Sequence, residues 1–423
     1  MRCMSRWRRL ISEAWVVGAL LVCRPFGPLS ALAYGSVSQH TASTSVCRAS
    51  AGPTAQAERR LYAASRQDGT VSVIDAANGA LVSTIRVGPS PVIIAVDETV
   101  PNGSAFVADQ ARIITPSPVR YGPSRVSVLE AHSGRVLQTI SINAQISSLA
   151  VDSRRGRLFL TAGDSRVWML DASTLKILAR LPLGANPVDV GIDRRNGHVF
   201  VDSADANGAG SVEMLDVRSG RLLATTTIGR QPGQLIVDER SGRVFVGNYG
   251  GTSPFSSLSM LDATTGRAVT TVPLNTGSIG LSLDEQAGRI FVTTGDNAGG
   301  GILLTLNSTS GHILSTVATV YSAVAIPDVR TKRLFVFGYL GSMVAVLDEI
   351  TGQRLHSIHV GQNLRAIAVD QQTGCVFAAA EGPSGPMQQP VGKGTIYVLD
   401  GRTGIVLHAT TVGRNPTALA VGD

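Results

Sequence analysis

The sequence predicts an all-β fold, a β-propeller of eight four-stranded blades. Three observations lead to this prediction. One pattern recurs eight times at intervals of 41 to 55 residues, each copy carries an aromatic residue at a fixed place, and each copy holds four short apolar stretches. A repeat of about 45 residues with four strands is typical of a propeller blade. The chain of 423 residues is long enough to bury a large core.

The first mark of each copy is a tight turn between two strands. In the first copy, VSVIDAANG places Asp75 four residues before Gly79. Asp at such a turn accepts backbone N–H bonds, and Gly adopts a positive φ. The residues equivalent to Asp75 are Glu130, Asp171, Asp216, Asp262, Asn307, Asp348 and Asp400. Gly follows four residues later in every copy except one, which has Leu175. We therefore expect these acidic residues to be structural and not catalytic.

The second mark is an aromatic residue in a short apolar run of each copy. The eight aromatic residues are Tyr62, Phe106, Phe159, Phe200, Phe245, Phe291, Phe335 and Phe377. A side chain of this size buries a large apolar area, so we expect the column to be a layer of the core and not a ligand-stacking stripe.

The four strands of a copy are clearest around Asp262, where they read QLIVD, RVFVGN, SLSMLD and AVTTVPL. They show little polar alternation, as expected for blades that neighbours cover on both faces. The pattern enters at Tyr62 in a second strand and finishes at 416–423 in a first strand. We expect this last strand to complete the blade begun by residues 60–88, which removes open sheet edges. A seven-bladed ring that leaves out the worn copy around Asn307 is the alternative.

The N-terminal residues predict export. Residues 1–33 combine a basic start (MRCMSRWRRL), an apolar run (AWVVGALLVC) and a final SALA that ends in Ala33. This order is typical of a cleaved secretory signal peptide, and the apolar run is too short to span a bilayer. Residues 34–58, rich in Ser, Thr and Ala, are predicted to be a disordered linker. The propeller is expected over 59–423, in a secreted, cell-surface or periplasmic protein without a transmembrane segment in its mature chain.

The charge of the chain changes the expected partner once the signal is removed. The full chain carries a formal net charge of +7, and cleavage after Ala33 leaves 32 basic and 29 acidic residues, or +3. That balance does not indicate an obligate nucleic-acid binder. Of four cysteines, only Cys47 and Cys375 survive cleavage. We expect Cys375 to be a buried small hydrophobic residue, and whether it pairs with Cys47 stays open.

The repeat resembles a known family. VSVIDAANGALVSTIRVGPSPVIIAVD (71–97), GRVFVGN (242–248) and VGRNPTALAV (412–421) are similar to the YVTN-type β-propeller repeat, over about residues 60–423. The resemblance implies an exported propeller and implies no single activity. Relatives of this architecture include surface-layer proteins, dehydrogenase heavy chains, lactonase-like enzymes and nucleic-acid-binding members. Fold alone does not choose among them.

Enzyme signatures are missing from the sequence. It contains no H-E-x-x-H, no G-x-S-x-G and no P-loop. We therefore expect no catalytic residues, metal or cofactor, and we favour a non-catalytic binding scaffold that is a monomer. A lactonase-like enzyme, a dehydrogenase heavy chain and a single-stranded nucleic-acid-binding propeller are the alternatives.

Two long loops depart from the repeat and predict a binding face. Both lie between the second and third strands of their copies, at 109–125 in copy two and at 380–394 in copy eight. In a closed ring these copies flank copy one, so the loops frame one face above it. Binding sites belong on loops that a rigid scaffold holds.

The candidate ligand-binding residues follow from this face. They are Arg112, Arg120, Tyr121 and Arg125 in the first loop, Lys393 in the second, and the aromatic rings of Tyr249 and Tyr339. Arg beside Tyr suits an anionic or aromatic ligand, a glycan or a protein. Two further residues, Asp189 and Arg365, stand on innermost strands where other copies are small or apolar. They either face each other across the central channel or each point into channel water.

Overall fold

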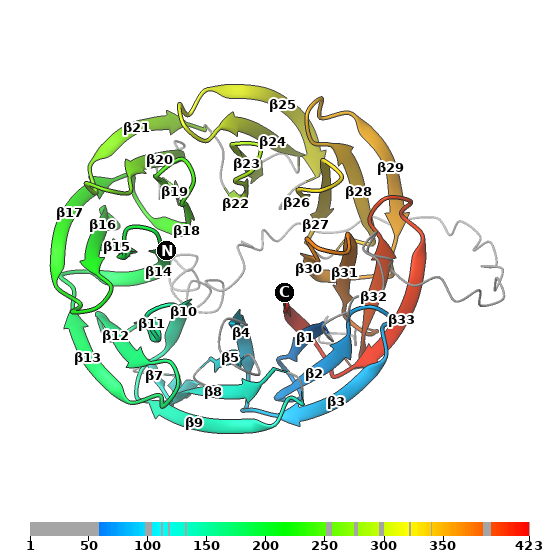
Figure 1. Cartoon of the computed structure of the whole chain (residues 1–423), viewed down its shortest axis with the longest axis horizontal. Helices are drawn as coiled ribbons and strands as arrows, with labels where there is room; N and C mark the ends of the chain where they lie inside the picture. The colour runs from blue at the N-terminus through cyan, green and yellow to red at the C-terminus, as the bar shows by residue number, and fades with distance from the viewer. Residues whose placement is uncertain are drawn as a thin grey trace, which may run out of the picture.

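Eight antiparallel sheets of four strands each stand around a central axis in the described part of the chain (Figure 1). The computed structural model describes residues 59–422 apart from 98–103, 111–112, 117–118, 132, 251–255, 275–277, 296–299, 321–322, 340 and 384–390. The predicted eight-bladed propeller is confirmed, and the seven-bladed alternative is wrong. The predicted signal peptide 1–33 and linker 34–58 lie outside the described residues.

The blades are numbered from the first repeat, and each is given from its innermost strand outward. Blade 1 holds β34 (Pro416–Val421), β1 (Arg60–Ser65), β2 (Thr70–Asp75) and β3 (Leu81–Arg86). Blade 2 holds β4 (Pro91–Asp97), β5 (Ser104–Asp109), β8 (Ser124–Glu130) and β9 (Val136–Ile142). Blade 3 holds β10 (Ile146–Asp152), β11 (Arg157–Ala162), β12 (Arg166–Asp171) and β13 (Ile177–Pro182). Blade 4 holds β14 (Asn186–Asp193), β15 (His198–Ala204), β16 (Gly210–Asp216) and β17 (Leu222–Ile228).

The second half of the ring repeats this arrangement. Blade 5 holds β18 (Pro232–Asp238), β19 (Arg243–Asn248), β20 (Ser257–Asp262) and β21 (Ala268–Pro273). Blade 6 holds β22 (Ser278–Asp284), β23 (Arg289–Gly295), β24 (Gly300–Asn307) and β25 (Ile313–Val320). Blade 7 holds β26 (Ala323–Asp328), β27 (Arg333–Gly338), β28 (Met343–Asp348) and β29 (Arg354–His359). Blade 8 holds β30 (Leu364–Val369), β31 (Cys375–Ala380), β32 (Gly394–Asp400) and β33 (Val406–Val412).

The turn between the third and fourth strands has the chemistry that the repeat predicts. In blade 1, Asp75 Oδ1 accepts the backbone N–H of Ala77 at 2.9 Å, and the N–H of Gly79 bonds to the Asp75 carbonyl at 2.9 Å. Gly79 has a φ of 71°. The departure at Leu175 keeps the same geometry, because Leu175 has a φ of 51° and donates to the Asp171 carbonyl. The turn therefore forms even where Gly is replaced.

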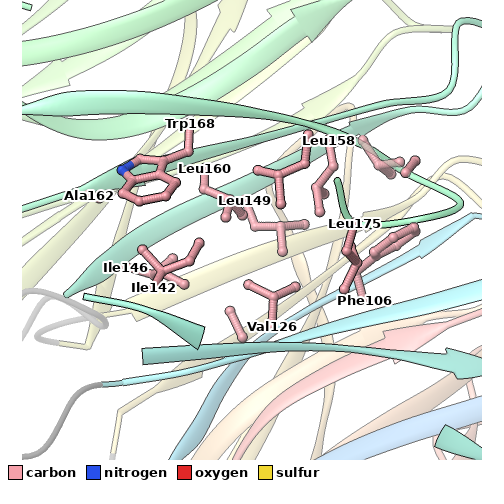
Figure 2. Packing of buried hydrophobic residues seen from close by; sticks show 14 of the residues in the cluster. Phe106, Val126, Ile142, Ile146, Leu149, Leu158, Leu160, Ala162, Trp168 and Leu175 are labelled. Atoms are coloured by element: carbon pink, nitrogen blue, oxygen red, sulfur yellow. The ribbon is translucent and has the colours of Figure 1, made fainter. Parts of the chain in front are cut away.

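The aromatic column is core, as expected. All eight of its side chains are among the largest fully buried side chains of the described residues. They lie between neighbouring blades, where a Phe from one sheet packs with aliphatic side chains of the next. Between blades 2 and 3, Phe106 lies with Leu158, Trp168 and Leu175 (Figure 2). The propeller therefore has a hydrophobic cluster at each junction and no single central core.

The ring closes in blade 1. The last strand, β34, pairs antiparallel with β1, so that Leu61 lies opposite Val421 and Ala63 opposite Leu419. The N–H of Gly422 donates to the carbonyl of Arg60 at 2.8 Å. Strand β34 also packs between β30 of blade 8 and β4 of blade 2. This arrangement confirms the predicted closure.

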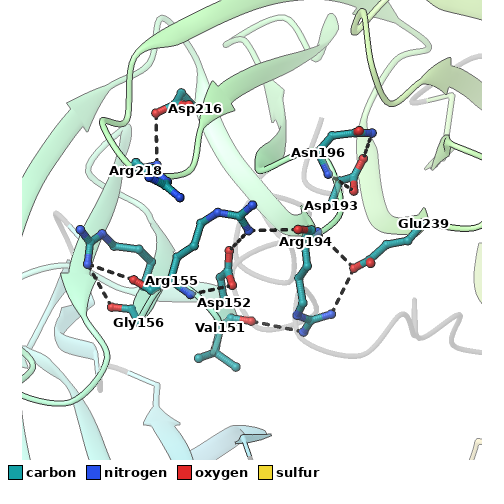
Figure 3. A network of polar contacts seen from close by, with 11 residues as sticks. Val151, Asp152, Arg155, Gly156, Asp193, Arg194, Asn196, Asp216, Arg218 and Glu239 are labelled. Atoms are coloured by element: carbon teal, nitrogen blue, oxygen red, sulfur yellow. Dashed lines mark hydrogen bonds and ion pairs between the residues drawn. The ribbon is translucent and has the colours of Figure 1, made fainter. Parts of the chain in front are cut away.

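Polar side chains join the blades at the turns between first and second strands (Figure 3). Arg155 pairs with Asp152 at 2.9 Å within blade 3 and reaches the carbonyl of Arg194 in blade 4 at 3.0 Å. Arg194 in turn pairs with Glu239 of blade 5 at 3.4 Å. Successive copies are therefore tied around the ring on this face, which we call the turn face.

Cys375 is buried, as predicted, and the sequence leaves its bonding open. Its side chain lies fully buried at the start of β31 and is disulfide-bonded. The other cysteines, Cys3, Cys23 and Cys47, lie outside the described residues. Within the described residues, no helix is long and apolar enough to cross a membrane.

Candidate functional site

The two long loops leave the ring from equivalent strand junctions. The connection from β5 to β8 contains a small hairpin of β6 (Ile113–Pro116) and β7 (Val119–Tyr121). The other connection runs from β31 to β32. Connections between second and third strands share one face with those that enter the next blade, and we call it the insertion face. Blades 2 and 8 flank blade 1, so the two loops leave the blades on either side of the closing blade (Figure 1). Strand β7 of the first insertion is drawn on the side of blade 2 that faces blade 3.

A short loop of blade 1, residues 66–69, lies between the blades that carry the two insertions. Its Arg66 reaches toward blade 2, where Nε donates to Ser90 Oγ at 3.1 Å and Nη2 donates to Gln110 Oε1 at 2.8 Å. No carboxylate pairs with Arg66 in the described part of the chain. The half-buried guanidinium therefore keeps its positive charge at the rim of the first insertion.

The same loop makes an ion pair on its other side. Asp68 accepts from Nε of Arg414 at 2.7 Å and from the Arg414 backbone N–H at 2.8 Å. Burial acts to raise the pKa of Asp68, but the hydrogen bonds and charge of Arg414, with the charge of Lys393, outweigh it and lower this pKa. Asp68 thus lies near two positive charges. One belongs to Arg414, and the other to Lys393 of the second insertion, which is close enough to help lower the pKa of Asp68.

A second group of polar residues lies where blade 7 meets blade 8. Arg365 pairs through Nη2 with Glu381 Oε1 at 2.6 Å, and its guanidinium carbon lies 4.6 Å from the centre of the Tyr339 ring. Its Nη1 also donates to the Tyr339 hydroxyl. Burial raises the pKa of Glu381, although Arg365 acts in the opposite direction. Tyr339, Arg365 and Glu381 form one stacked, ion-paired unit at the base of the second insertion.

Asp109 is the last residue of β5, where the first insertion begins. It is buried, and its Oδ1 accepts the backbone N–H of Arg125 at the start of β8. A side chain at Gly88 would collide with Asp109 Oδ2, at 2.2 Å from the place of its Cβ. Burial raises the pKa of Asp109 to about 6, although Arg125 acts to lower it.

The sequence-predicted residues fall in three groups. Arg125 and Lys393 are exposed beside the closing blade, and Tyr339 lies at the edge of the same region. Arg120 and Tyr121 belong to β7, and Arg112 lies outside the described residues. The other three predicted residues, Tyr249, Asp189 and Arg365, are described next.

Tyr249 belongs to a different part of the face. It follows β19 in blade 5, and its ring lies against Gly233, where an added Cβ would meet ring carbon Cε2 at 2.1 Å. Burial, with the charges of Asp202 and then Asp189, raises the pKa of Tyr249 to about 12. Blade 5 is remote from both insertions around the ring (Figure 1).

Asp189 and Arg365 have separate sets of partners. Asp189 accepts from Ser148 Oγ of blade 3 at 2.5 Å and from the backbone N–H of Leu235 of blade 5 at 2.9 Å. It therefore ties three innermost strands together. Arg365 belongs to the unit with Glu381. No interaction joins Asp189 to Arg365 in the described part of the chain.

Sequence reasoning missed four residues of this site, namely Arg66, Asp68, Gln110 and Arg414. A signal for two of them existed. Arg66 and Gln110 stand four residues after Tyr62 and Phe106, at the place that Tyr339 and Glu381 occupy in their own copies. Reading this column across all copies would have found them. In the described residues, no group of three or more His, Cys, Asp or Glu side chains is arranged to hold a metal ion.

Comparison with known proteins gives a family and a fold. The sequence matches the profile of the PQQ_2 family, described as the outer membrane protein assembly factor BamB, over residues 67–253 and 254–422. No curated protein matches the sequence.

Solved structures share the propeller fold at low sequence identity. BamB from Moraxella catarrhalis is 15% identical with a TM-score of 0.55, and the match covers 75% of this chain and 87% of that chain. Kuenenia stuttgartiensis hydrazine synthase is 13% identical with a TM-score of 0.55, covering 69% and 92%. The dihydro-heme d1 dehydrogenase NirN, in complex with DHE, is 11% identical with a TM-score of 0.67, covering 85% and 74%.

Proposed function

Because this chain belongs to the PQQ_2 family of the outer membrane protein assembly factor BamB, we propose that it is a non-catalytic, exported scaffold that binds an acidic segment of a partner protein on its insertion face. The observation that supports the proposal is that both insertions belong to the blades on either side of the closing blade. A rigid ring with two long loops on the blades beside blade 1 is a binding arrangement. The family supports a protein as the partner.

Charge supports an acidic partner. Five basic residues lie in blade 1 or in the blades beside it, namely Arg66, Arg125, Arg365, Lys393 and Arg414, together with the three acids Asp68, Asp109 and Glu381. Burial raises the pKa of Asp109 to about 6 and also raises the pKa of Glu381, although Arg125 and Arg365 act in the opposite direction. A positive face attracts an acidic chain at long range, and the attraction falls with salt.

The disulfide at Cys375 supports export. Disulfides persist in oxidising compartments such as the periplasm and the cell exterior, and they are rare in the cytosol. The predicted signal peptide 1–33 points the same way.

The test uses a triple variant in the first insertion, Arg112/Arg120/Arg125→Ala. Binding of a labelled oligoglutamate peptide is measured by fluorescence anisotropy at low and high salt. We expect the wild-type protein to bind and the variant to bind at least about tenfold more weakly, as expected for lost charge contacts. The matched control is Arg154/Arg218/Arg402→Ala, which removes the same charge from exposed positions on the turn face.

The outcomes separate the alternatives. Equal binding by the insertion variant and the wild-type protein, with both melting alike, would show that this face is not the site. Single-stranded DNA and an acidic glycan are run as parallel probes. Preference for either one over the peptide would replace the protein partner with that ligand.

A further inference from the structure

A pocket of about 360 Å³ lies between blades 3 and 4, away from the two insertions. One wall is the connection from β13 to β14, contributed by Pro182, Leu183, Gly184 and Ala185. The other wall is the face of blade 4, contributed by Ser211, Glu213, Leu222 and Thr225. The pocket lies on the insertion face, at a junction that carries neither of the two insertions.

Glu213 is the charged residue of this pocket lining. Its side chain is buried, with only 6% of the residue exposed. Its Oε2 accepts from Ser203 Oγ at 2.7 Å, and its Oε1 accepts from Ser211 Oγ at 2.7 Å. Within the described residues, no Arg, Lys or His pairs with it. Two hydroxyl donors leave further acceptor sites on the carboxylate, and buried charges in proteins are ordinarily paired.

The repeat shows that the propeller does not need an acid at this place. The equivalent residue, three before the turn Asp or its counterpart, is neutral in all seven other copies. These residues are Ser72, Ser127, Trp168, Ser259, Leu304, Ala345 and Tyr397. Blade geometry is therefore satisfied by a hydroxyl, an aliphatic or an aromatic side chain, and the carboxylate of Glu213 has no role that the fold itself explains.

A second carboxyl group lies in the same blade, on the opposite face of its sheet from Glu213. Asp202 is fully buried on the neighbouring strand β15, and its Oδ2 has no hydrogen-bond partner. Burial raises the pKa of Asp202 well above its usual range, and the charges of Asp189 and then Glu213 raise it further. A raised pKa favours the neutral form of Asp202, so Glu213 alone supports a cation here.

The remaining walls suit an alkyl chain. Pro182, Leu183, Ala185 and Leu222 supply apolar surface, and Leu222 is 52% exposed, so the wall reaches the solvent. At Gly184 nothing lies within 4 Å of the place of a Cβ. The pocket therefore has an open entrance, apolar sides and a single buried carboxylate.

We propose that this pocket binds a primary ammonium group carried on an aliphatic stem, with the ammonium on Glu213 and the stem against Leu183 and Leu222. Two sources share this chemistry, a small free amine and the lysine side chain of a protein. The three N–H donors of an ammonium group match the free acceptor sites of the carboxylate. This inference does not rest on the proposed partner face.

The test titrates the exported, full-length protein with three probes and follows its methyl NMR signals. The probes are n-pentylammonium, the peptide acetyl-Ala-Lys-Ala-amide and the neutral analogue 1-pentanol. We expect saturable shifts with at least one cationic probe and none with 1-pentanol at the same concentration. Binding of both cations would indicate a site for small amines as well as lysine, and binding of the peptide alone would indicate a lysine of a partner protein.

Two variants make the test specific. Glu213→Gln keeps the shape of the side chain and removes its charge, and we expect binding at least about tenfold weaker. Gly184→Phe fills the entrance at a position with open space and ordinary backbone geometry, so it blocks binding even if the Gln variant folds poorly. The matched control is Glu239→Gln on the turn face, which leaves binding unchanged.

Two results would overturn the proposal. One is the absence of saturable binding of either cation to the folded wild-type protein up to about 50 mM, a range in which even weak ligands give shifts. The other is equal binding by wild type, Glu213→Gln and Gly184→Phe.

Discussion

At the scale of single residues, the ring contains buried carboxyl groups whose charged form is disfavoured by the burial. Glu349 follows β28 and is 1% exposed, and its Oε1 lies 3.3 Å from Nη1 of Arg289. Burial and the charge of Asp284 raise the pKa of Glu349 to about 7, while Lys332 and Arg289 act to lower it. The folded state therefore holds a proton on this group at pH values where the unfolded chain has lost it.

This shift predicts a pH-dependent effect of Glu349→Gln. The pKa of Glu349 is higher in the folded state than in the unfolded chain. The stabilisation that Glu349 gives the wild-type fold is therefore fully present below about pH 4.5 and is lost as the pH rises to about 7. Glu349→Gln cannot titrate, so its free energy of unfolding should rise relative to that of the wild type between about pH 4.5 and 7. The expected improvement is on the order of 1 to 3 kcal/mol. Urea unfolding at a series of pH values measures it.

Asp171 supplies a control of opposite sign. Its hydrogen bonds from the Ser173 and Thr174 hydroxyls and N–H groups lower the pKa of Asp171 to about 2, although burial opposes them. Its contribution is present above the unfolded value of 3.8 and is lost as pH falls toward 2. Asp171→Asn should therefore be most harmful at neutral pH. A flat difference between Glu349→Gln and wild type from pH 4.5 to 7 would contradict the assignment.

At the scale of elements, the turn at Leu175 combines two opposed effects. The positive φ of 51° disfavours any residue except Gly, while the Leu side chain is buried in the cluster between blades 2 and 3. Truncation to Ala loses the burial and keeps the strain. Truncation to Gly loses the burial and relieves the strain. The turn geometry therefore favours Gly at this position, whereas the core packing favours Leu.

The expected order of stability follows from this opposition. Leu175→Ala should lower the free energy of unfolding by about 2–5 kcal/mol. Leu175→Gly should be less harmful than Leu175→Ala by about 0.5–1 kcal/mol. At Leu158, fully buried in the same cluster but within strand β11, the order should reverse, because Gly weakens a strand. Guanidinium unfolding of the four variants measures these differences. If the Ala and Gly variants rank in the same order of stability at Leu175 and at Leu158, the prediction is wrong.

The closing strand gives a prediction for a whole element. Deletion of 416–423 removes β34 and leaves unpaired edges on β1 and unfilled space beside β4 and β30. The truncated chain should melt roughly 10 °C or more below the full chain, since several kcal/mol of packing are lost. Removal of Asp423 alone is the control. Calorimetric melting curves that coincide for the two truncations would mean that closure does not stabilise the ring.

At the scale of the whole molecule, the repeat made the fold predictable and left the site partly hidden. Eight copies in register identify strands, turns and the aromatic layer, because those features depend on periodicity that each copy restates. The site depends on contacts between different copies. Arg66 meets Gln110, and Asp68 meets Arg414, only because the ring brings blades 1, 2 and 8 together. Periodicity predicts equivalent positions, but it does not predict which unlike side chains meet across a junction.

The disulfide is the whole-molecule prediction. If the proposed cleavage after Ala33 takes place, Cys47 is the single other cysteine of the mature chain, so Cys375 should be linked to it. Peptide mapping of exported protein under non-reducing conditions should find one peptide pair joining the two, with an N-terminus after Ala33. Reduction and alkylation of a parallel sample is the control. Free Cys375 thiol in exported protein, or linkage to a second chain, would contradict this expectation.

The closing blade also sets the order in which the molecule can assemble. Asp68 and Arg414, which form an ion pair at that blade, are 346 residues apart in sequence. A growing chain completes blades 2 to 8 from local segments, but blade 1 stays a three-stranded fragment with an unpaired inner edge until β34 arrives. Contacts between such distant segments form slowly. A chain threading through a membrane pore would therefore remain an open arc during most of its passage, and the ring would lock only when its last strand emerged.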